Sequence, residues 1–196
     1  MDYEVEYNNR ARVPEHPDVQ MRWQRSAGAA REELDCAFDL TYADRPRNLY
    51  DVVHPSAGQG TDAPLIVFIH GGYWQRGDRK DYTGMASELS RRGLRVVLPS
   101  YTLCPDCEVG DIISEMRTLC ATIWRRFARR PVICGHSAGG HLAAALLATD
   151  WSGPGDLPLD LVPAAYAISG VYDLSPLVST TVNDALRLTS ESAVAY

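Results

Sequence analysis

A serine flanked by glycines is the residue of this sequence best suited to covalent chemistry. The stretch Gly135 to Gly139 reads GHSAG, follows a short apolar run and precedes a stretch with helical character. At such a strand-to-helix turn the hydroxyl of Ser137 would leave the plane of the sheet and face a helix N-terminus, where free N–H groups favour developing negative charge. The placement predicts a catalytic nucleophile. A bare GxSxG arises by chance in about one chain of this size in twenty, so an inert serine in a glycine-rich turn is the alternative.

A second glycine motif could supply the electrostatic half of the same chemistry. Gly71 and Gly72 come directly after an apolar run that ends at Ile69. Two glycines at the carboxyl end of a buried strand let backbone N–H groups approach a substrate oxygen closely. We expect these two amides to join the amide of Ala138 in an oxyanion hole. A plain tight turn is the alternative.

Three other residues of the same loop, His70, Tyr73 and Trp74, are candidates for contact with a substrate. Tyr73 and Trp74 could form an aromatic wall for a substrate ring, or could pack at the rim against the N-terminal arm. His70 fits a local hydrogen-bonding or packing role better than a catalytic one. We therefore place the three residues near the substrate without giving them a chemical step.

The cysteines do not predict a metal site or a disulfide framework. Their number is odd, and Cys104 and Cys107 form a CxxC without the second pair that a zinc site needs. The Pro105-Asp106 interior of this CxxC follows an apolar strand as a turn would. We expect a site with no metal and no cofactor.

Strand and helix patterns alternate through the part of the chain that carries both glycine motifs. The expected strands are Pro64 to Ile69, Leu94 to Leu98, Pro131 to Cys134 and Val162 to Ile168. The expected helices are Tyr82 to Arg92, Asp111 to Arg129 and Ala138 to Ala148. This order predicts an α/β fold with a mostly parallel sheet, right-handed crossovers and helices on both faces.

The flanking segments look different from this alternating core. Residues 1–34 are polar and rich in arginine, and we expect an arm or cap with a helix around Val19 to Leu34, after Pro14 and Pro17 break the chain. Residues 35–196 form the core of a single domain. Its flanking parts are an antiparallel pair, Cys36 to Tyr42 with Asn48 to His54, a loop from Ser56 to Ala63, and loop and helix from Leu174 to Tyr196.

Composition restricts the class of protein and its partners. The 196 residues are 45% hydrophobic and 22% charged, which suits one domain with a sizeable core. A net charge of -6 argues against nucleic acid as a partner. No apolar run approaches the roughly 20 residues needed to cross a membrane. We expect a soluble, cytoplasmic protein that acts on a small-molecule substrate.

Five stretches of the sequence together form a recognisable pattern. They are EYNNR at Glu6 to Arg10, HGGYW at His70 to Trp74, PSYTLCP at Pro99 to Pro105, GHSAGGHL at Gly135 to Leu142, and SGVYDLSPL at Ser169 to Leu177. The chain resembles the α/β-hydrolase superfamily over essentially its whole length. Within that superfamily it resembles the serine-type arylformamidases, or kynurenine formamidases, and their bacterial esterase-like relatives. HGGYW together with EYNNR indicates a much narrower group of proteins than GxSxG or HGG does.

The resemblance implies an activity and roles for the motif residues. It implies hydrolysis of a formyl amide on an arylamine, namely N-formylkynurenine in tryptophan breakdown, without a cofactor. Ser137 would attack the formyl carbonyl. The amides of Gly71, Gly72 and Ala138 would then hold the oxyanion. The same arrangement accepts esters, so a short-chain carboxylesterase is a second hypothesis, and a non-catalytic binding module is a third.

The catalytic base has no good candidate in the sequence. A serine nucleophile needs a histidine and an acid, which in this fold follow the serine in the order acid, then histidine. His141 is the one histidine after Ser137, and it lies a single turn along the same helix, too close to reach the leaving group. The resemblance implies a structural or substrate-proximal role for Asp173. His16, His54 and His136 do not fit the role of base either.

We therefore expect that the chain is a truncated hydrolase that lacks about two β/α units of roughly 30 residues each. The alternative is a protein that has lost the chemistry. Truncation would leave the strand Val162 to Ile168 as an uncovered sheet edge. Such an edge favours self-association, so a homo-oligomer is a partner to consider.

Overall fold

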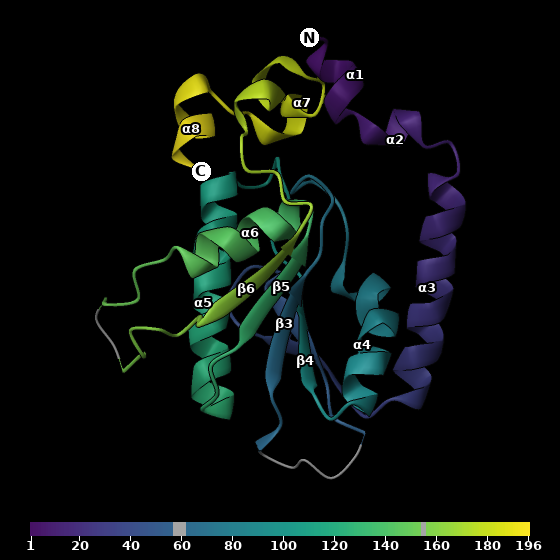
Figure 1. Cartoon of the computed structure of the whole chain (residues 1–196), viewed down its shortest axis with the longest axis vertical. Coiled ribbons are helices and arrows are strands. Elements are labelled where there is room, and N and C mark those ends of the chain that lie inside the picture. The colour runs from purple at the N-terminus through teal and green to yellow at the C-terminus, as the bar shows by residue number, and fades with distance from the viewer. Residues whose placement is uncertain (57–61, 154–155) are drawn as a thin grey trace.

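A six-stranded sheet lies at the centre of the protein. The structure is a computed structural model that describes residues 1–56, 62–153 and 156–196. In these residues the strand order is β1-β2-β4-β3-β5-β6 (Figure 1). The strands are β1 Cys36–Thr41, β2 Leu49–Val53, β3 Leu65–Ile69, β4 Arg95–Pro99, β5 Val132–His136 and β6 Ala164–Ile168.

The directions of the strands follow the sequence pattern. β4, β3, β5 and β6 are parallel neighbours. β2 pairs antiparallel with β4, and β1 pairs antiparallel with β2. The predicted mostly parallel sheet and the predicted antiparallel pair before it are both confirmed. The continuous apolar run of β3 reflects its central place, because such a strand is covered on both faces.

Helices cover the two faces of this sheet. On one face, α5 (Val109–Phe127) and α6 (Ala138–Leu147) enclose the larger core cluster with Val67 and Ile69 of β3. On the other face, α4 (Thr83–Arg91) covers a smaller cluster that includes Phe68. The alternation along β3 is the two-residue period of a strand. The helix positions agree with the prediction to within a few residues.

The N-terminal segment is more helical than the sequence suggested. It contains α1 (Tyr3–Tyr7), α2 (Asn9–Arg12) and α3 (His16–Glu33). The expectation that Pro17 breaks the chain was wrong, because Pro17 lies in the first turn of α3. Proline is tolerated there, since the first N–H groups of a helix have no partner within the helix. α3 forms an outer layer against α4 (Figure 1).

A buried ion-pair network joins this outer layer to the sheet. Asp51 of β2 is fully buried and accepts hydrogen bonds from Arg79 Nε at 2.9 Å and from Arg31 Nη1 at 2.6 Å. Arg79 belongs to the short helix η2 (Arg79–Tyr82), and Arg31 to α3. Arg79 also pairs with Asp39. The network therefore fixes the loop after β3 against both α3 and the sheet.

The C-terminal part returns over the carboxyl end of the sheet. It contains η3 (Ser175–Ser179), α7 (Asn183–Leu186) and α8 (Ser190–Ala195), as the predicted loop and helix (Figure 1). The backbone N–H of Thr181 donates to Glu4 Oε2 at 2.8 Å, which joins this part to α1. β6 is the last strand in the sheet order, and Tyr166 on it is 67% exposed.

Further expectations from the sequence concern the loop Ser56 to Ala63, the cysteines and membrane-spanning helices. The predicted loop Ser56 to Ala63 lies largely outside the described residues.

Cys104 and Cys107 are buried, and the Cys107 thiol donates to the carbonyl oxygen of Thr102 at 3.4 Å. Within the described ranges, no cluster of three or more metal-ligating side chains is found. A search of the same residues finds no helix with the length and apolar character to span a membrane.

Candidate active site

The pairing of β3 with β5 brings the two glycine motifs together. Ile69, the last residue of β3, lies opposite Gly135 of β5 in a parallel pair. Because parallel strands end at the same edge of a sheet, the loop after β3 meets the turn after β5. The sheet therefore positions Gly71 and Gly72 next to Ser137.

Ser137 has a strained backbone at the turn between β5 and α6. Its φ of 57° and ψ of -119° lie in a region that non-glycine residues rarely adopt. The Ser137 N–H donates to the carbonyl oxygen of Ile168 at 2.9 Å, so the turn is held against β6. The side chain is half-buried. The structure thus has the sharp strand-to-helix turn that the sequence predicted.

The glycines around Ser137 allow two backbones to approach closely. A β-carbon on Gly135 would lie 2.0 Å from the carbonyl oxygen of Gly139. A β-carbon on Gly139 would lie 2.1 Å from the carbonyl oxygen of Ile69. Both distances are far below van der Waals contact. The glycines of the GxSxG motif are therefore required for α6 to pack against the ends of β5 and β3.

Gly71 contacts Ser137 from the neighbouring loop, and Gly72 lines the same cavity as the serine. A β-carbon on Gly71 would lie 3.0 Å from Ser137 Cβ and 2.7 Å from the carbonyl oxygen of His136. Gly72 has a φ of +118°, and a β-carbon there would lie 2.3 Å from the carbonyl oxygen of Arg76. Ala138 is fully buried as the first residue of α6. Of the three residues predicted to carry oxyanion-binding amides, Gly71 and Ala138 therefore adjoin the serine, and Gly72 lines the same cavity.

The other predicted residues of the loop have different environments. Tyr73 is half-buried, lines a cavity beside Ser137, and donates its hydroxyl to the carbonyl oxygen of Tyr7 at 2.7 Å. Trp74 is fully buried and packs edge-on against His141, with ring centroids 5.1 Å apart. Trp74 is thus a core residue, and the expectation that it forms a cavity wall or packs at the rim was wrong. Tyr73 both lines the cavity and contacts the N-terminal arm.

His70 is also buried in the core. It is 1% exposed and stacks on Tyr101 at a ring-centroid distance of 4.4 Å. Its Nδ1 lies 2.8 Å from the carbonyl oxygen of Gly71. Burial lowers the pKa of His70 to about 4, so the ring is neutral at pH 7. His70 supports the glycine loop from beneath and does not line the cavities beside Ser137.

The remaining histidines do not contact the Ser137 hydroxyl. His141 is 3% exposed, and its Nε2 lies 2.9 Å from the carbonyl oxygen of Tyr196. Burial lowers the pKa of His141. In residues 1–56, 62–153 and 156–196, no side chain forms a hydrogen bond with Ser137 Oγ. None of the described side chains is therefore placed as a base that takes the proton of Ser137 Oγ.

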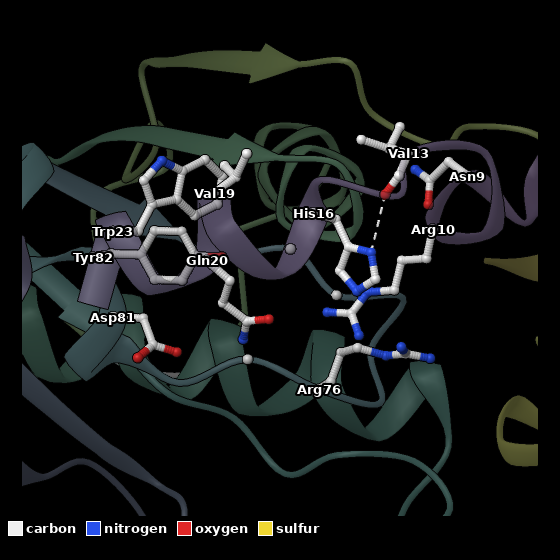
Figure 2. Close-up of a pocket in the computed structure, with 13 residues that line it drawn as sticks. Asn9, Arg10, Val13, His16, Val19, Gln20, Trp23, Arg76, Asp81 and Tyr82 are labelled. Atoms are coloured by element: carbon white, nitrogen blue, oxygen red, sulfur yellow. Dashed lines mark hydrogen bonds between the residues drawn. The ribbon is translucent and has the colours of Figure 1, made fainter. Parts of the chain in front are cut away.

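Two adjoining cavities open in front of the serine. Ser137 lines a cavity of about 190 Å³. A second cavity, of about 410 Å³, lies between the N-terminal helices and the glycine loop (Figure 2). Both cavities are lined by Arg10, Trp23, Arg76 and Tyr82 together with Gly71 and Gly72. They therefore form one continuous cleft.

The side chains that line this cleft opposite the serine are not among the residues predicted from the sequence. Arg10 lies on α2, Trp23 on α3, and Arg76 in the loop before η2. Arg10 ends the EYNNR stretch, which was noted only as part of a family pattern. No spacing in the sequence indicates that α2 and α3 lie over the loop after β3. Only the folded chain shows that α2 and α3 lie there.

The fold and this arrangement define an α/β-hydrolase, and comparisons with known proteins agree. The BD-FAE family matches residues 50–154, which is slightly more than half of the chain. The chain belongs to the BD-FAE family of α/β-hydrolases and resembles arylformamidases and esterases. A crystal structure from Silicibacter sp. tm1040, provisionally named a thioesterase, is 30% identical with a TM-score of 0.85. The match covers 100% of this chain and 73% of that protein.

Two curated relatives are named for hydrolytic activities. A kynurenine formamidase of Danio rerio is 34% identical over 167 residues, which cover 84% of this chain and 56% of that protein. An isoprenylcysteine alpha-carbonyl methylesterase of Arabidopsis thaliana is 26% identical over 156 residues, which cover 71% of this chain and 35% of that protein. The chain thus spans little more than half the length of the formamidase.

Proposed function

We propose that this chain carries the nucleophile and the oxyanion hole of a serine hydrolase. Ser137 attacks the carbonyl carbon of the substrate, and the negative charge that develops on the carbonyl oxygen is bound by backbone amides. The proposed donors are Gly71, Gly72 and Ala138. The observation that carries the proposal is the strained turn at Ser137 in contact with Gly71 on the wall of a cleft.

The energetic role of the amides follows from their environment. Donors that are fixed before the reaction stabilise the transition state more than the ground state, and loss of one costs about 10²–10³ in kcat. The buried Ala138 and the tightly packed Gly71 have little freedom to move away.

A serine hydroxyl also needs a base to accept its proton. Since no described side chain forms a hydrogen bond with Ser137 Oγ, the full-length gene product is the form to be tested.

We infer that the substrate is a formyl amide of an arylamine, similar to N-formylkynurenine. The Danio rerio relative named kynurenine formamidase supports this substrate class. The cleft supports it as well, because Trp23 and Tyr82 present aromatic rings with centroids 6.0 Å apart. Hydrolysis would release formate and the free arylamine. The corresponding role is in tryptophan breakdown, in the cytoplasm, with no cofactor.

We further propose that residues 1–34 act as a cap over a core formed by residues 35–196. Arg10 and Trp23 of this segment line the cleft. The hydrogen bond from the Tyr73 hydroxyl to Tyr7 joins the cap to the glycine loop. A cap of this kind would limit the access of bulk water to the cleft and shape the cleft for an aryl group.

A short-chain carboxylesterase is the second candidate function. It is favoured by the Arabidopsis thaliana relative, which is named a methylesterase. The proposed chemistry at Ser137 is the same for esters and formamides, because both pass through a tetrahedral oxyanion. The two functions differ in the leaving group. They therefore require different residues on the walls of the cleft.

Two measurements on the full-length gene product test these proposals. The first is mass spectrometry after reaction with a fluorophosphonate, with Ser137→Ala as the control. Label on Ser137 is expected, and an unlabelled serine would favour a non-catalytic binding module. The second compares kcat/KM for N-formylkynurenine with that for p-nitrophenyl acetate. A higher value for the formamide is expected, and equal or better ester turnover would favour the carboxylesterase.

A further inference from the structure

The larger cavity of the cleft has a cationic end and an aromatic end. Figure 2 shows Arg10, His16 and Arg76 gathered at one end. Trp23 and Tyr82 lie at the other end, and Asp81 lies beside them. The charges of the cavity are therefore separated along its length. A ligand that fits it would combine an apolar ring with an anionic group.

The two arginines of the cationic end have no hydrogen-bond or ion-pair partner among the described residues. Arg79 pairs with Asp51, and Arg47 pairs with Asp78. By contrast, no hydrogen bond or ion pair joins Arg10 or Arg76 to any of the described residues. Burial and the charge of Arg10 both lower the pKa of Arg76, so the two guanidinium groups are close enough to repel each other. An anion between them would remove this repulsion.

The position of Arg10 and Arg76 relative to Ser137 shows how long a ligand must be to contact all three residues. Arg10 and Arg76 line the smaller cavity together with Ser137, and they line the larger cavity together with Trp23. Backbone packing also fixes Arg76 close to the proposed oxyanion hole, since its carbonyl oxygen lies against Gly72. One small molecule could therefore contact the serine, the aromatic rings and both arginines.

We propose that Arg10 and Arg76 bind a carboxylate of the substrate while its aryl ring lies against Trp23 and Tyr82. This inference rests on the proposed function and names the two residues that would recognise the carboxylate of such an aryl formamide. Guanidinium groups suit this role because their paired N–H donors match the two oxygens of a carboxylate. The arginines act in substrate selection and take no part in the chemical step.

The test is a binding measurement with a matched pair of ligands. L-kynurenine carries the carboxylate, whereas its carboxamide has nearly the same shape without that charge. Neither has a formyl group, so neither is turned over. Isothermal titration calorimetry on the full-length gene product is expected to give at least about tenfold tighter binding of L-kynurenine, since hydrogen bonds to charged groups are worth about 1.5–3 kcal/mol.

Variants of the two arginines then separate the carboxylate from the rest of the ligand. Arg10→Gln or Arg76→Gln should weaken binding of L-kynurenine by about tenfold and change binding of the carboxamide less than about twofold. Arg12→Gln is the control, because Arg12 lies on the same helix as Arg10 and pairs with Glu6 outside the cavities. Equal affinity of the wild type for both ligands would overturn the proposal. So would an equal loss for both ligands in the arginine variants.

Failure of this inference can be told apart from failure of the proposed function. Binding is measured without turnover, and labelling of Ser137 by fluorophosphonate reports the nucleophile independently. If Ser137 is unlabelled but the preference for the carboxylate depends on Arg10 and Arg76, the anion site stands and the hydrolase proposal fails. If Ser137 is labelled and the arginine variants leave the preference unchanged, the anion site alone is refuted.

Discussion

Gly71 lies directly against Ser137, since a β-carbon on Gly71 would stand only 3.0 Å from Ser137 Cβ. The two residues belong to motifs that are far apart in the sequence and follow different strands. They meet because β3 and β5 are parallel neighbours that end at the same edge of the sheet. This contact joins the proposed nucleophile to the proposed oxyanion hole.

Replacement of Gly71 should therefore impair the site more than the fold. In Gly71→Ala the new methyl group would meet the carbonyl oxygen of His136 at 2.7 Å and push the loop away from Ser137. We expect the rate of fluorophosphonate labelling to fall by about 10²-fold, the usual effect of losing an oxyanion donor. Gly28→Ala is the control, since nothing lies within 4 Å of a β-carbon there. Unchanged labelling of Gly71→Ala would contradict the role of the loop.

Replacement of Gly139 should impair the fold itself. A β-carbon on this residue would lie 2.1 Å from the carbonyl oxygen of Ile69, so α6 would have to move away from β3. We expect Gly139→Ala to lower the free energy of unfolding by about 1–3 kcal/mol, as overpacking does. Urea denaturation measures the change, with Gly153→Ala as a control that has open space around it. Equal midpoints for the two variants would show that the close packing is not required.

The buried carboxylate of Asp51 should be essential for stability. It accepts hydrogen bonds from both Arg79 and Arg31, and its side chain is fully buried. Asp51→Asn removes the buried anion between Arg79 and Arg31, and breaking a buried ion pair typically costs about 3–5 kcal/mol. Urea denaturation should show this loss, whereas Glu88→Gln on the exposed face of α4 should leave the midpoint unchanged. A loss below about 1 kcal/mol would mean that water replaces the pair.

The buried His70 should make stability depend on pH in the acidic range. Its pKa is about 4 in the folded protein against an ordinary value of 6.5, so the unfolded chain binds more protons between these limits. The free energy of unfolding should therefore fall as the pH is lowered from 6.5 to about 4. The pKa of His141 is lowered as well and acts in the same direction. In His70→Asn the slope should become shallower, and a slope equal to that of the wild type would contradict a neutral buried ring.

The order of strands and helices could be predicted because local patterns determine it. The apolar stripe of α5 includes Ile112, Met116, Leu119 and Ile123, and each of these side chains is fully buried. The turn at Ser137 was predictable for a similar reason. Its glycines reflect contacts with adjacent strands that any GxSxG between a strand and a helix would make.

The walls of the cleft could not be predicted because they depend on contacts between distant segments. Trp74 was expected near the substrate, yet its positive φ of 55° turns the chain and the ring packs in the core on His141. Arg10 and Arg76 meet only because the N-terminal helices lie over the loop after β3. Periodicity describes which face of an element is apolar, but not which distant element covers it.

The most direct test of the site is a crystal structure of the full-length gene product after reaction with a fluorophosphonate. We predict a phosphorus atom bonded to Ser137 Oγ. Its phosphonyl oxygen should lie about 2.7–3.1 Å from the amide nitrogen of Ala138 and from that of Gly71 or Gly72. Failure of Ser137 to form the adduct, or an oxygen beyond hydrogen-bonding distance of these amides, would contradict the proposed nucleophile and oxyanion hole.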